Sequence, residues 1–252
     1  MKLLIISDLH IGENQDFNTF QWNSSDFIKM LRLIILEHKI DKIILNGDIY
    51  DLYQTTFDKI QVVNTEIIDY FNMPEFVYIK GNHDISMRFG LNSFTIRNSS
   101  NKLVHIEHGH KADFTSGTRL GRIISKYFIQ LLIRIVKVRT GKALFNRIHN
   151  YYEEIEHVPR KYNSIKYLTY ALRLLRKYDM VIFGHTHKLE VHKTFFILQK
   201  KVYINSGTCS LGRFQGIVLN TENLKYKLLK FSKKAVVKYL KKNDLMVSPH
   251  TA

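Results

Sequence analysis

The sequence predicts an α/β fold. Three short β-branched runs, "LLIIS", "KIIL" and "FVYIK", end at polar residues or glycine, as buried strands do. Between them, around residues 25–38 and 57–71, apolar residues recur at helical spacing. Polar clusters stand where the strands end, which is where sites form in sheets of this kind. The first half is therefore predicted to be a βαβαβ series.

Later segments continue the α/β pattern around a helical insertion. After the run "KLVHIEHGH", apolar residues recur every three or four positions from Leu120 to Val136, which predicts an amphipathic helix of about five turns. A second helix is expected at about 164–177. Strands are expected at "MVIFG", "FFILQ", "KVYINSG", "QGIVLN" and "KYKLLKF", followed by a lysine-rich helix. We expect one domain over residues 1–252, with a helical insertion at about 115–178.

Charge and cysteine content limit the partners and the compartment. The net charge is +16, and fourteen Lys and Arg residues against three acids lie between Thr118 and Tyr178. An anionic partner is expected: nucleic acid, an anionic lipid surface or a phosphorylated substrate. Cys209 is the single cysteine, so no internal disulfide can form, and a cytoplasmic location is expected.

Candidate metal ligands follow five of the apolar runs, in "SDLH", "NGDIYD", "KGNHD", "EHGHK" and "FGHTH". Carboxylate, imidazole and amide donors suit divalent ions, with manganese expected first and iron, zinc or magnesium as alternatives. Seven ligands are too many for one ion and suit two, the arrangement used in phosphoryl displacement. The candidates are Asp8, His10, Asp48, Asn82, His108, His185 and His187.

This ordered set resembles the calcineurin-like metallophosphoesterases, whose pattern is D-x-H, G-D-x-x-D, G-N-H-D/E, H and G-H-x-H. The resemblance implies a two-sheet sandwich flanked by helices. It implies one ion held by Asp8, His10, Asp48 and His187, and a second held by Asp48, Asn82, His108 and His185. His83 would protonate the leaving oxygen, steadied by Asp84. His110 is an alternative ligand to His108. We favour His108 because it lies closer to the preceding strand.

The insertion resembles the helical lid of the UDP-2,3-diacylglucosamine pyrophosphatases of lipid A biosynthesis, although His83 stands where that branch commonly has arginine. The resemblance implies a lipid-linked pyrophosphate substrate, cleaved to UMP and an acylated sugar phosphate, and a peripheral position at the inner face of a membrane. Candidate substrate-binding residues are Arg119, Arg122, Phe128, Leu132, Arg134 and Lys137.

Three alternatives stay open. The apolar stripe of the insertion could pack on the sandwich, with its charges as a solvated face. The chain could be a nuclease or nucleotide phosphodiesterase that uses its positive charge on a nucleic acid backbone, although no aromatic ladder or nucleic-acid module is evident. It could also be a non-catalytic scaffold, but a scaffold has no need to keep a full ligand set.

Overall fold

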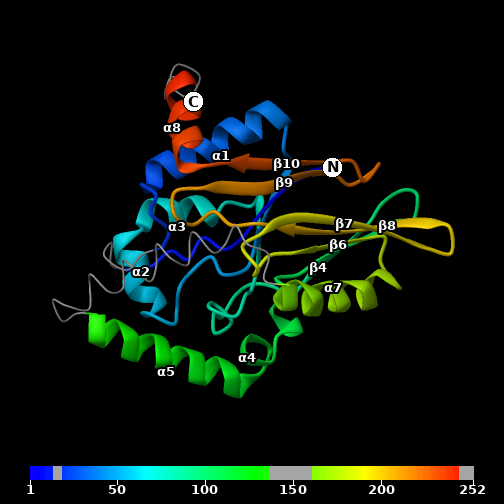
Figure 1. Cartoon of the computed structure of the whole chain (residues 1–252). Helices are drawn as coiled ribbons and strands as arrows, with labels where there is room; N and C mark the ends of the chain where they lie inside the picture. The colour runs from blue at the N-terminus through cyan, green and yellow to red at the C-terminus, as the bar shows by residue number, and fades with distance from the viewer. Residues whose placement is uncertain (14–18, 137–160, 244–252) are drawn as a thin grey trace.

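Two five-stranded sheets form the centre of the structure (Figure 1). The computed structural model describes residues 1–13, 19–136 and 161–243. The first sheet has the order β10-β9-β1-β2-β3 and the second β4-β5-β6-β8-β7. The strands are β1 Lys2–Ile6, β2 Lys42–Asn46, β3 Phe76–Ile79, β4 Phe94–Arg97, β5 Leu103–Ile106, β6 Met180–Phe183, β7 Leu189–Phe196, β8 Gln199–Ser206, β9 Phe214–Asn220 and β10 Tyr226–Phe231.

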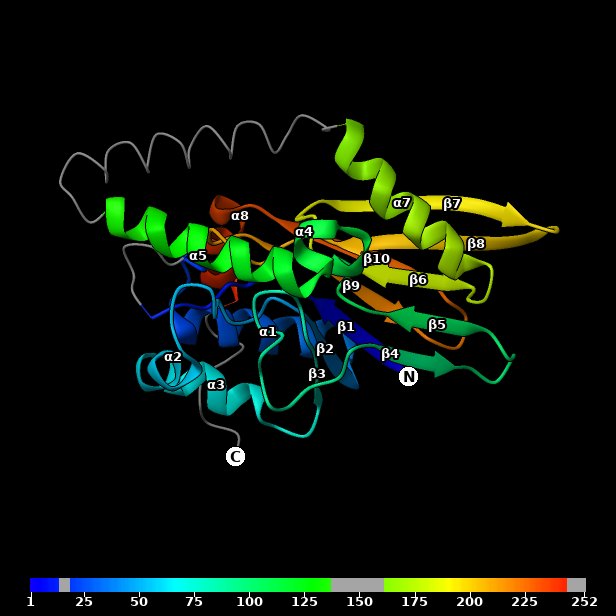
Figure 2. The same cartoon turned by 90° about the horizontal axis from the view of Figure 1, so that it is seen from below.

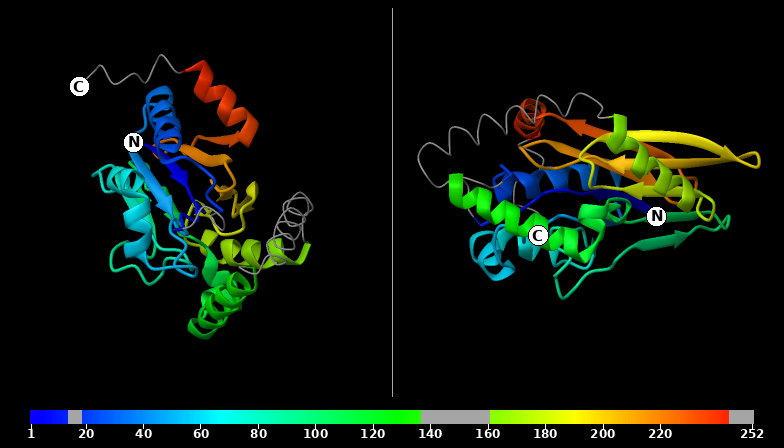
Figure 3. Two further views of the ribbon diagram at one scale, coloured as in Figure 1. Left: turned by 90° about the vertical axis from the view of Figure 1, so that its left-hand side faces the viewer. Right: turned by 60° about the horizontal axis from the view of Figure 1, so that its bottom comes forward.

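Helices cover both outer faces of this sandwich. The first sheet packs against α1, α2, α3 and α8, and the second packs against α7. In Figures 1 and 3, α8 and α5 lie on opposite sides of the molecule. The helices are α1 Ser24–His38, α2 Phe57–Val63, α3 Thr65–Phe71, α4 Phe114–Gly117, α5 Arg119–Val136, α7 Lys161–Leu175 and α8 Lys233–Lys242, with a 3-10 turn η1 at His110–Ala112. The predicted sandwich flanked by helices is confirmed.

Alternation along the strands explains why the sheets stack. Leu3 and Ile5 of β1 point inward and meet Ile106 and Ile182 of the second sheet in a buried layer. Leu4 and Ile6 point outward, toward the helices. Successive side chains of a strand face opposite sides, so a continuous apolar run is required where both sides are buried.

Parallel pairing brings the polar strand ends together. β1, β2 and β3 pair in parallel, and so do β5, β6 and β8. In each sheet the loops after the parallel strands therefore leave from one edge. The loops that follow β1, β2, β3, β5 and β6 carry the candidate ligands. A bridge between Ile11 and Tyr50 joins the loops after β1 and β2. The edges of the two sheets meet where the His185 amide donates to Asp8.

Three details differ from the sequence expectations. The helix expected over 57–71 is two helices, α2 and α3, because Asn64 leaves the helical conformation at φ −121° and ψ 35°. The strand expected at "FFILQ" is interrupted: Phe195 and Phe196 end β7 and Gln199 begins β8, while Ile197 and Leu198, both with positive φ, form the turn between them. β4 was not expected, since its four residues give too short a pattern.

Among the α5 residues whose side chains are described, the apolar stripe does not pack on the sandwich. Leu120, Ile124 and Tyr127 are exposed, as are Ile123, Phe128 and Leu131. None of the helices within the described ranges is long and apolar enough to cross a bilayer.

Candidate metal centre

The seven predicted ligands lie on five loops that leave the strand ends. Asp8 and His10 follow β1, and Asp48 follows β2. The remaining four are Asn82 after β3, His108 after β5, and His185 and His187 after β6. Asp8, Asp48, Asn82 and His108 are buried, and so is His10. Residues up to 179 positions apart in sequence thus meet at one point between the sheets.

Left-handed backbone marks five of these seven positions. Asp8, His10, Asp48, His185 and His187 have φ between 52° and 69°. Non-glycine residues rarely adopt this conformation, and Asp and His tolerate it better than most. Strained conformations of this kind gather at functional sites, where the surrounding fold holds them. Here the left-handed residue turns the chain sharply as it leaves the strand, so the side chain faces the centre.

Two groups of side chains each bring three ligand atoms within 4.8 Å of one another: Asp8, His10 and His187 in one, and Asp48, His108 and His185 in the other. In the first, Nε2 of His187 is 3.2 Å from Oδ1 of Asp8 and 3.2 Å from Nε2 of His10. In the second, Nε2 of His108 is 3.1 Å from Oδ2 of Asp48. Each group contains three of the four residues in one of the ligand sets that the resemblance implies.

Ligand atoms in both sets fit a divalent cation. Oδ1 of Asp8, Oδ1 of Asn82 and Nε2 of His108 are buried and accept no hydrogen bond from the part of the chain that the structure describes. A buried polar atom left without a partner is costly, and a cation supplies what it lacks. Oxygen and imidazole nitrogen are donors that manganese, iron and zinc all accept.

Backbone groups fix the other atoms of the same side chains. Oδ2 of Asp8 accepts from the His185 amide at 3.0 Å, and Oδ1 of Asp48 accepts from the His83 amide at 2.8 Å. Nδ1 of His108 lies 2.8 Å from the Asn46 carbonyl and donates to it, which leaves Nε2 as the ligand atom. Each of the three side chains therefore has one atom anchored and one directed at the centre.

Mutual electrostatics set the protonation of the cluster. Burial opposes ionisation of Asp8, yet His187 and His108 lower its pKa to about 2. Burial likewise disfavours charged His108, yet Asp48 and Asp8 raise the pKa of that imidazole to about 10. Burial lowers the pKa of His185 to about 3 and that of His10 to about 4. The carboxylates are thus ionised beside a protonated His108, while His10 and His185 are neutral, as ligands must be. A cation bound here would take the place of the proton on His108.

Between His108 and His110, the geometry favours His108. His110 opens η1, and its ring centroid lies 6.5 Å from that of His185, compared with 5.1 Å for His108. Nδ1 of His110 is buried without a hydrogen bond to any described residue, and burial lowers the pKa of His110 to about 3. His110 therefore lies behind the ligand group rather than in it.

The comparisons with known proteins agree with this geometry. A model of the calcineurin-like phosphoesterases matches residues 1–189, three quarters of the chain. The chain belongs to the calcineurin-like phosphoesterase family. No curated protein sequence matches it.

Several solved structures are similar to this family member at low sequence identity. They include a dimetal phosphatase from Danio rerio (11% identity, 92% of this chain and 99% of that one, TM-score 0.45). Vps29 complexed with zinc from Entamoeba histolytica has 16% identity, 92% and 100% coverage, and a TM-score of 0.42. A hypothetical protein from Pyrococcus horikoshii has 11% identity, 97% and 94% coverage, and a TM-score of 0.47. Likenesses at this level carry no argument about function.

His83 of this family member lies beside the centre with a partner that differs from the predicted one. Its Nδ1 is 2.9 Å from Oδ1 of Asp51, and Tyr53 stacks on its ring at 4.1 Å between centroids. Although burial opposes the charge, Asp48 and Asp51 raise the pKa of His83 to about 9. His10, Asp48 and His83 also form a third group of three close ligand atoms. The prediction that Asp84 steadies His83 is therefore wrong in its choice of carboxylate.

Asp84 instead braces two loops. Its Oδ2 accepts from the amide of Ile49 at 2.7 Å and the hydroxyl of Tyr78 at 2.6 Å, and its Oδ1 accepts from the amide of Gly81 at 2.6 Å. Burial and the neighbouring Asp48 raise its pKa to about 6. Asp84 thereby holds the loop after β2 against the loop after β3.

Gly81 lies where no side chain fits. A Cβ at this position would meet the carboxylate of Asp48 and its backbone nitrogen. The glycine of "KGNHD" therefore allows the chain after β3 to pass directly over the shared carboxylate.

The predicted lid residues are only partly placed. Nη1 of Arg122 donates to the carbonyls of Ser116 and Gly117 at 3.1 and 3.0 Å. Burial raises the pKa of Tyr53 and lowers that of His110, and the positive charge of Arg122 also acts to lower both. Arg119, Arg134 and Phe128 are exposed on α5. Leu132 belongs to α5, and Lys137 lies outside the described residues.

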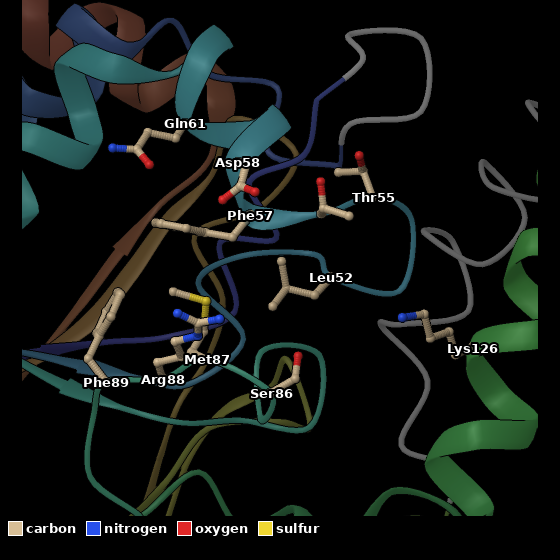
Figure 4. Close-up of a pocket in the computed structure, with 11 residues that line it drawn as sticks. Leu52, Thr55, Phe57, Asp58, Gln61, Ser86, Met87, Arg88, Phe89 and Lys126 are labelled. Carbon is tan, nitrogen blue, oxygen red and sulfur yellow. The ribbon is translucent and has the colours of Figure 1, made fainter.

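One face of α5 is polar and faces the site. Arg122, Lys126 and Gln130 are spaced by four residues, and Nε2 of Gln130 reaches the Tyr53 carbonyl at 3.4 Å. Lys126 also lines a cavity of about 590 Å³ together with Arg88, Phe57 and Phe89 (Figure 4). In Figure 4 Lys126 faces the other lining residues from across the cavity. Leu52, which follows Asp51 in the sequence, lines the same cavity.

The sequence did not indicate that two aromatic residues lie at the metal centre. Tyr53 and Tyr167 come from a loop and from α7, and Tyr167 lies edge-on to His185 at 5.5 Å between centroids. Asp51 did carry a signal, as the last residue of the motif G-D-x-x-D, and it accepts from the Tyr53 amide as a local cap would. Its position in the motif does not reveal His83 as its partner. Only the three-dimensional arrangement brings in the two tyrosines and the contact between Asp51 and His83.

Exchanging each carboxylate for its amide separates the roles of Asp51 and Asp84. Asp51→Asn weakens the bond that orients His83, so kcat on a small chromogenic phosphodiester should fall about tenfold or more, with little change in stability. Asp84→Asn places an amide nitrogen against backbone donors, so the free energy of unfolding in urea should fall by about 1–3 kcal/mol. Equal loss of kcat in both variants, with an unchanged urea midpoint for Asp84→Asn, would return the orienting role to Asp84.

Proposed function

We propose that this chain is a dinuclear metal-dependent hydrolase that cleaves a phosphate ester or diphosphate bond. The proposal rests on one observation: strand ends of both sheets direct unpartnered buried ligand atoms at one point, beside an imidazole that Asp51 orients. The first ion would be held by Asp8, His10, Asp48 and His187, and the second by Asp48, Asn82, His108 and His185. Manganese is the proposed ion, with iron, zinc and magnesium as alternatives.

When bound, two divalent ions supply positive charge for the phosphate oxygens and activate the attacking water. The residues of the chain do the rest. Asp48 belongs to both ligand sets and fixes their relative position. His83, held at Nδ1 by Asp51, keeps its second nitrogen free to give a proton to the leaving oxygen, and its raised pKa keeps it protonated at neutral pH.

For the substrate, we propose a lipid-linked pyrophosphate of the UDP-2,3-diacylglucosamine type, cleaved to UMP and an acylated sugar phosphate. Two features of α5 support this class. Its polar face carries Arg122, which acts electrostatically on Tyr53, and Lys126, which lines the cavity shared with Leu52 and Arg88; anionic phosphates would lie against these cations. Its opposite face exposes Ile124, Tyr127 and Phe128 to water, which suits contact with acyl chains at a membrane surface.

His83→Ala tests the hydrolase proposal. Removing the proton donor should lower kcat on a small chromogenic phosphodiester by about 10²–10⁴-fold, because a general acid contributes that much. Metal content, measured by inductively coupled plasma mass spectrometry, should match that of the wild type. If the variant loses metal together with turnover, His83 is a metal ligand together with His10 and Asp48. A wild type without phosphoesterase activity under saturating manganese would favour the scaffold alternative.

Phe128→Ser with Leu131→Ser tests the lipid-linked substrate. Both side chains are exposed, so the fold should survive their replacement. KM for a diacylated UDP-glucosamine should rise at least about tenfold, since each apolar side chain contributes roughly 1.5–3 kcal/mol when buried. KM for a small chromogenic phosphodiester should stay the same.

Charge reversal provides the matched control. Arg134→Glu, on the same helix, should change the lipid substrate's KM less than the serine pair does. If the wild type ignores the diacylated nucleotide sugar and degrades single-stranded DNA, with Arg134→Glu slowing that cleavage, the chain is a nuclease and the lipid proposal fails.

A further inference from the structure

The turn between β7 and β8 has an unusual composition. The last paired residues are Phe196 and Gln199, so Ile197 and Leu198 alone make the connection. Their φ values are 46° and 65°. Positive φ at both central residues is the geometry of a two-residue hairpin turn that favours Asn-Gly, and it is strained for a β-branched residue such as isoleucine.

Neither turn geometry nor packing explains these two side chains. Ile197 is 96% exposed and Leu198 is 97% exposed. Asparagine and glycine would form the same turn with less strain and without placing apolar atoms in water. The hairpin tip therefore carries apolar side chains although their exposure to water and their backbone strain destabilise the isolated protein.

The neighbouring residues extend this apolar tip and border it with charge. Phe195 is 69% exposed, whereas Phe196 points the other way and packs with the cluster under α7. Lys200 is the cross-strand partner of Phe195, and Lys193 stands two residues before Phe195 on the same face; both lysines are exposed. Three apolar side chains thus end the hairpin, with two cations directly behind them.

The hairpin also projects. In Figure 2 its tip extends beyond the ends of β5 and β6, two strands of the same sheet. β7 starts just after His187 and has eight residues, so the tip lies about 25 Å from the metal centre. A change at the tip therefore leaves the candidate metal centre untouched.

We propose that the hairpin tip, formed by Phe195, Ile197 and Leu198, inserts into an anionic lipid bilayer, with Lys193 and Lys200 at the headgroups. Apolar side chains backed by lysines match the layers of such a surface, and the net charge of +16 favours it. Three side chains on a projecting turn are too few for a stable protein interface, which needs about 800 Å² per partner. The proposal goes beyond the proposed function, because this docking requires neither substrate nor metal.

Vesicle binding of a turn variant tests the docking. Ile197→Asn with Leu198→Gly removes the apolar tip and relieves the strain, so the melting temperature should hold or rise. Partitioning of the full chain onto vesicles of equal phosphatidylcholine and phosphatidylglycerol should fall at least about tenfold relative to the wild type. Hydrolysis of a small chromogenic phosphodiester should not change, so failure of docking and failure of the proposed hydrolysis are separate results.

A fluorescent label locates the contact. Leu198→Cys carries an environment-sensitive dye, since Cys209 is buried, and Val62→Cys on α2, where Val62 is 80% exposed, is the control. Anionic vesicles should blue-shift the label at 198 and leave the label at 62 unchanged, also in the Phe128→Ser, Leu131→Ser background. The proposal is overturned if vesicles bind without a shift at 198, if no vesicle binding occurs, or if the shift at 198 appears with protein concentration alone.

Discussion

The carboxylate of Asp48 joins the two halves of the sandwich at the metal centre. One oxygen accepts from the His83 amide, in the loop after β3 of the first sheet. The other lies 3.1 Å from Nε2 of His108, which follows β5 of the second sheet. A buried carboxylate is expensive unless positive charge compensates it. The imidazoles of His108 and His83 lie beside Asp48 and supply such charge, and a pair of divalent cations would supply more.

The strained backbone conformations and the rigid apolar core occupy different parts of this fold. The interior of the sandwich is a dry layer of aliphatic side chains such as Ile5 and Ile182, in ordinary strand conformation. The left-handed residues lie just beyond the strand ends, where Asp8, Asp48 and His185 turn into the centre. The stability of the apolar layers is what holds these unfavourable conformations in place. Replacing the core with looser packing would therefore affect ligand geometry before it affected the fold.

The sequence predicted the ligand set because polar residues directly after apolar strands are visible locally, and parallel strands necessarily bring such positions to one edge. The partner of His83 was not predictable in this way. Asp84 follows His83 directly in the sequence, whereas Asp51 lies 32 positions before it. Only the paths of two loops decide that Asp51 reaches the imidazole while Asp84 braces the backbone. The hairpin at Ile197 and Leu198 was missed because it lacks the glycine and asparagine that signal a turn. Helical spacing revealed the amphipathic character of α5 but could not say which face meets the site.

The account depends on one carboxylate serving two cations, and metal stoichiometry measures this most directly. Wild-type protein reloaded with manganese, freed of excess ion and analysed by mass spectrometry should approach two ions per chain. Asp48→Ala should retain fewer than one, because both ligand sets lose a member, while Val62→Ala on the exposed face of α2 should match the wild type. Wild-type protein that holds almost no metal at saturation, or an Asp48→Ala variant that keeps both ions, would contradict the account.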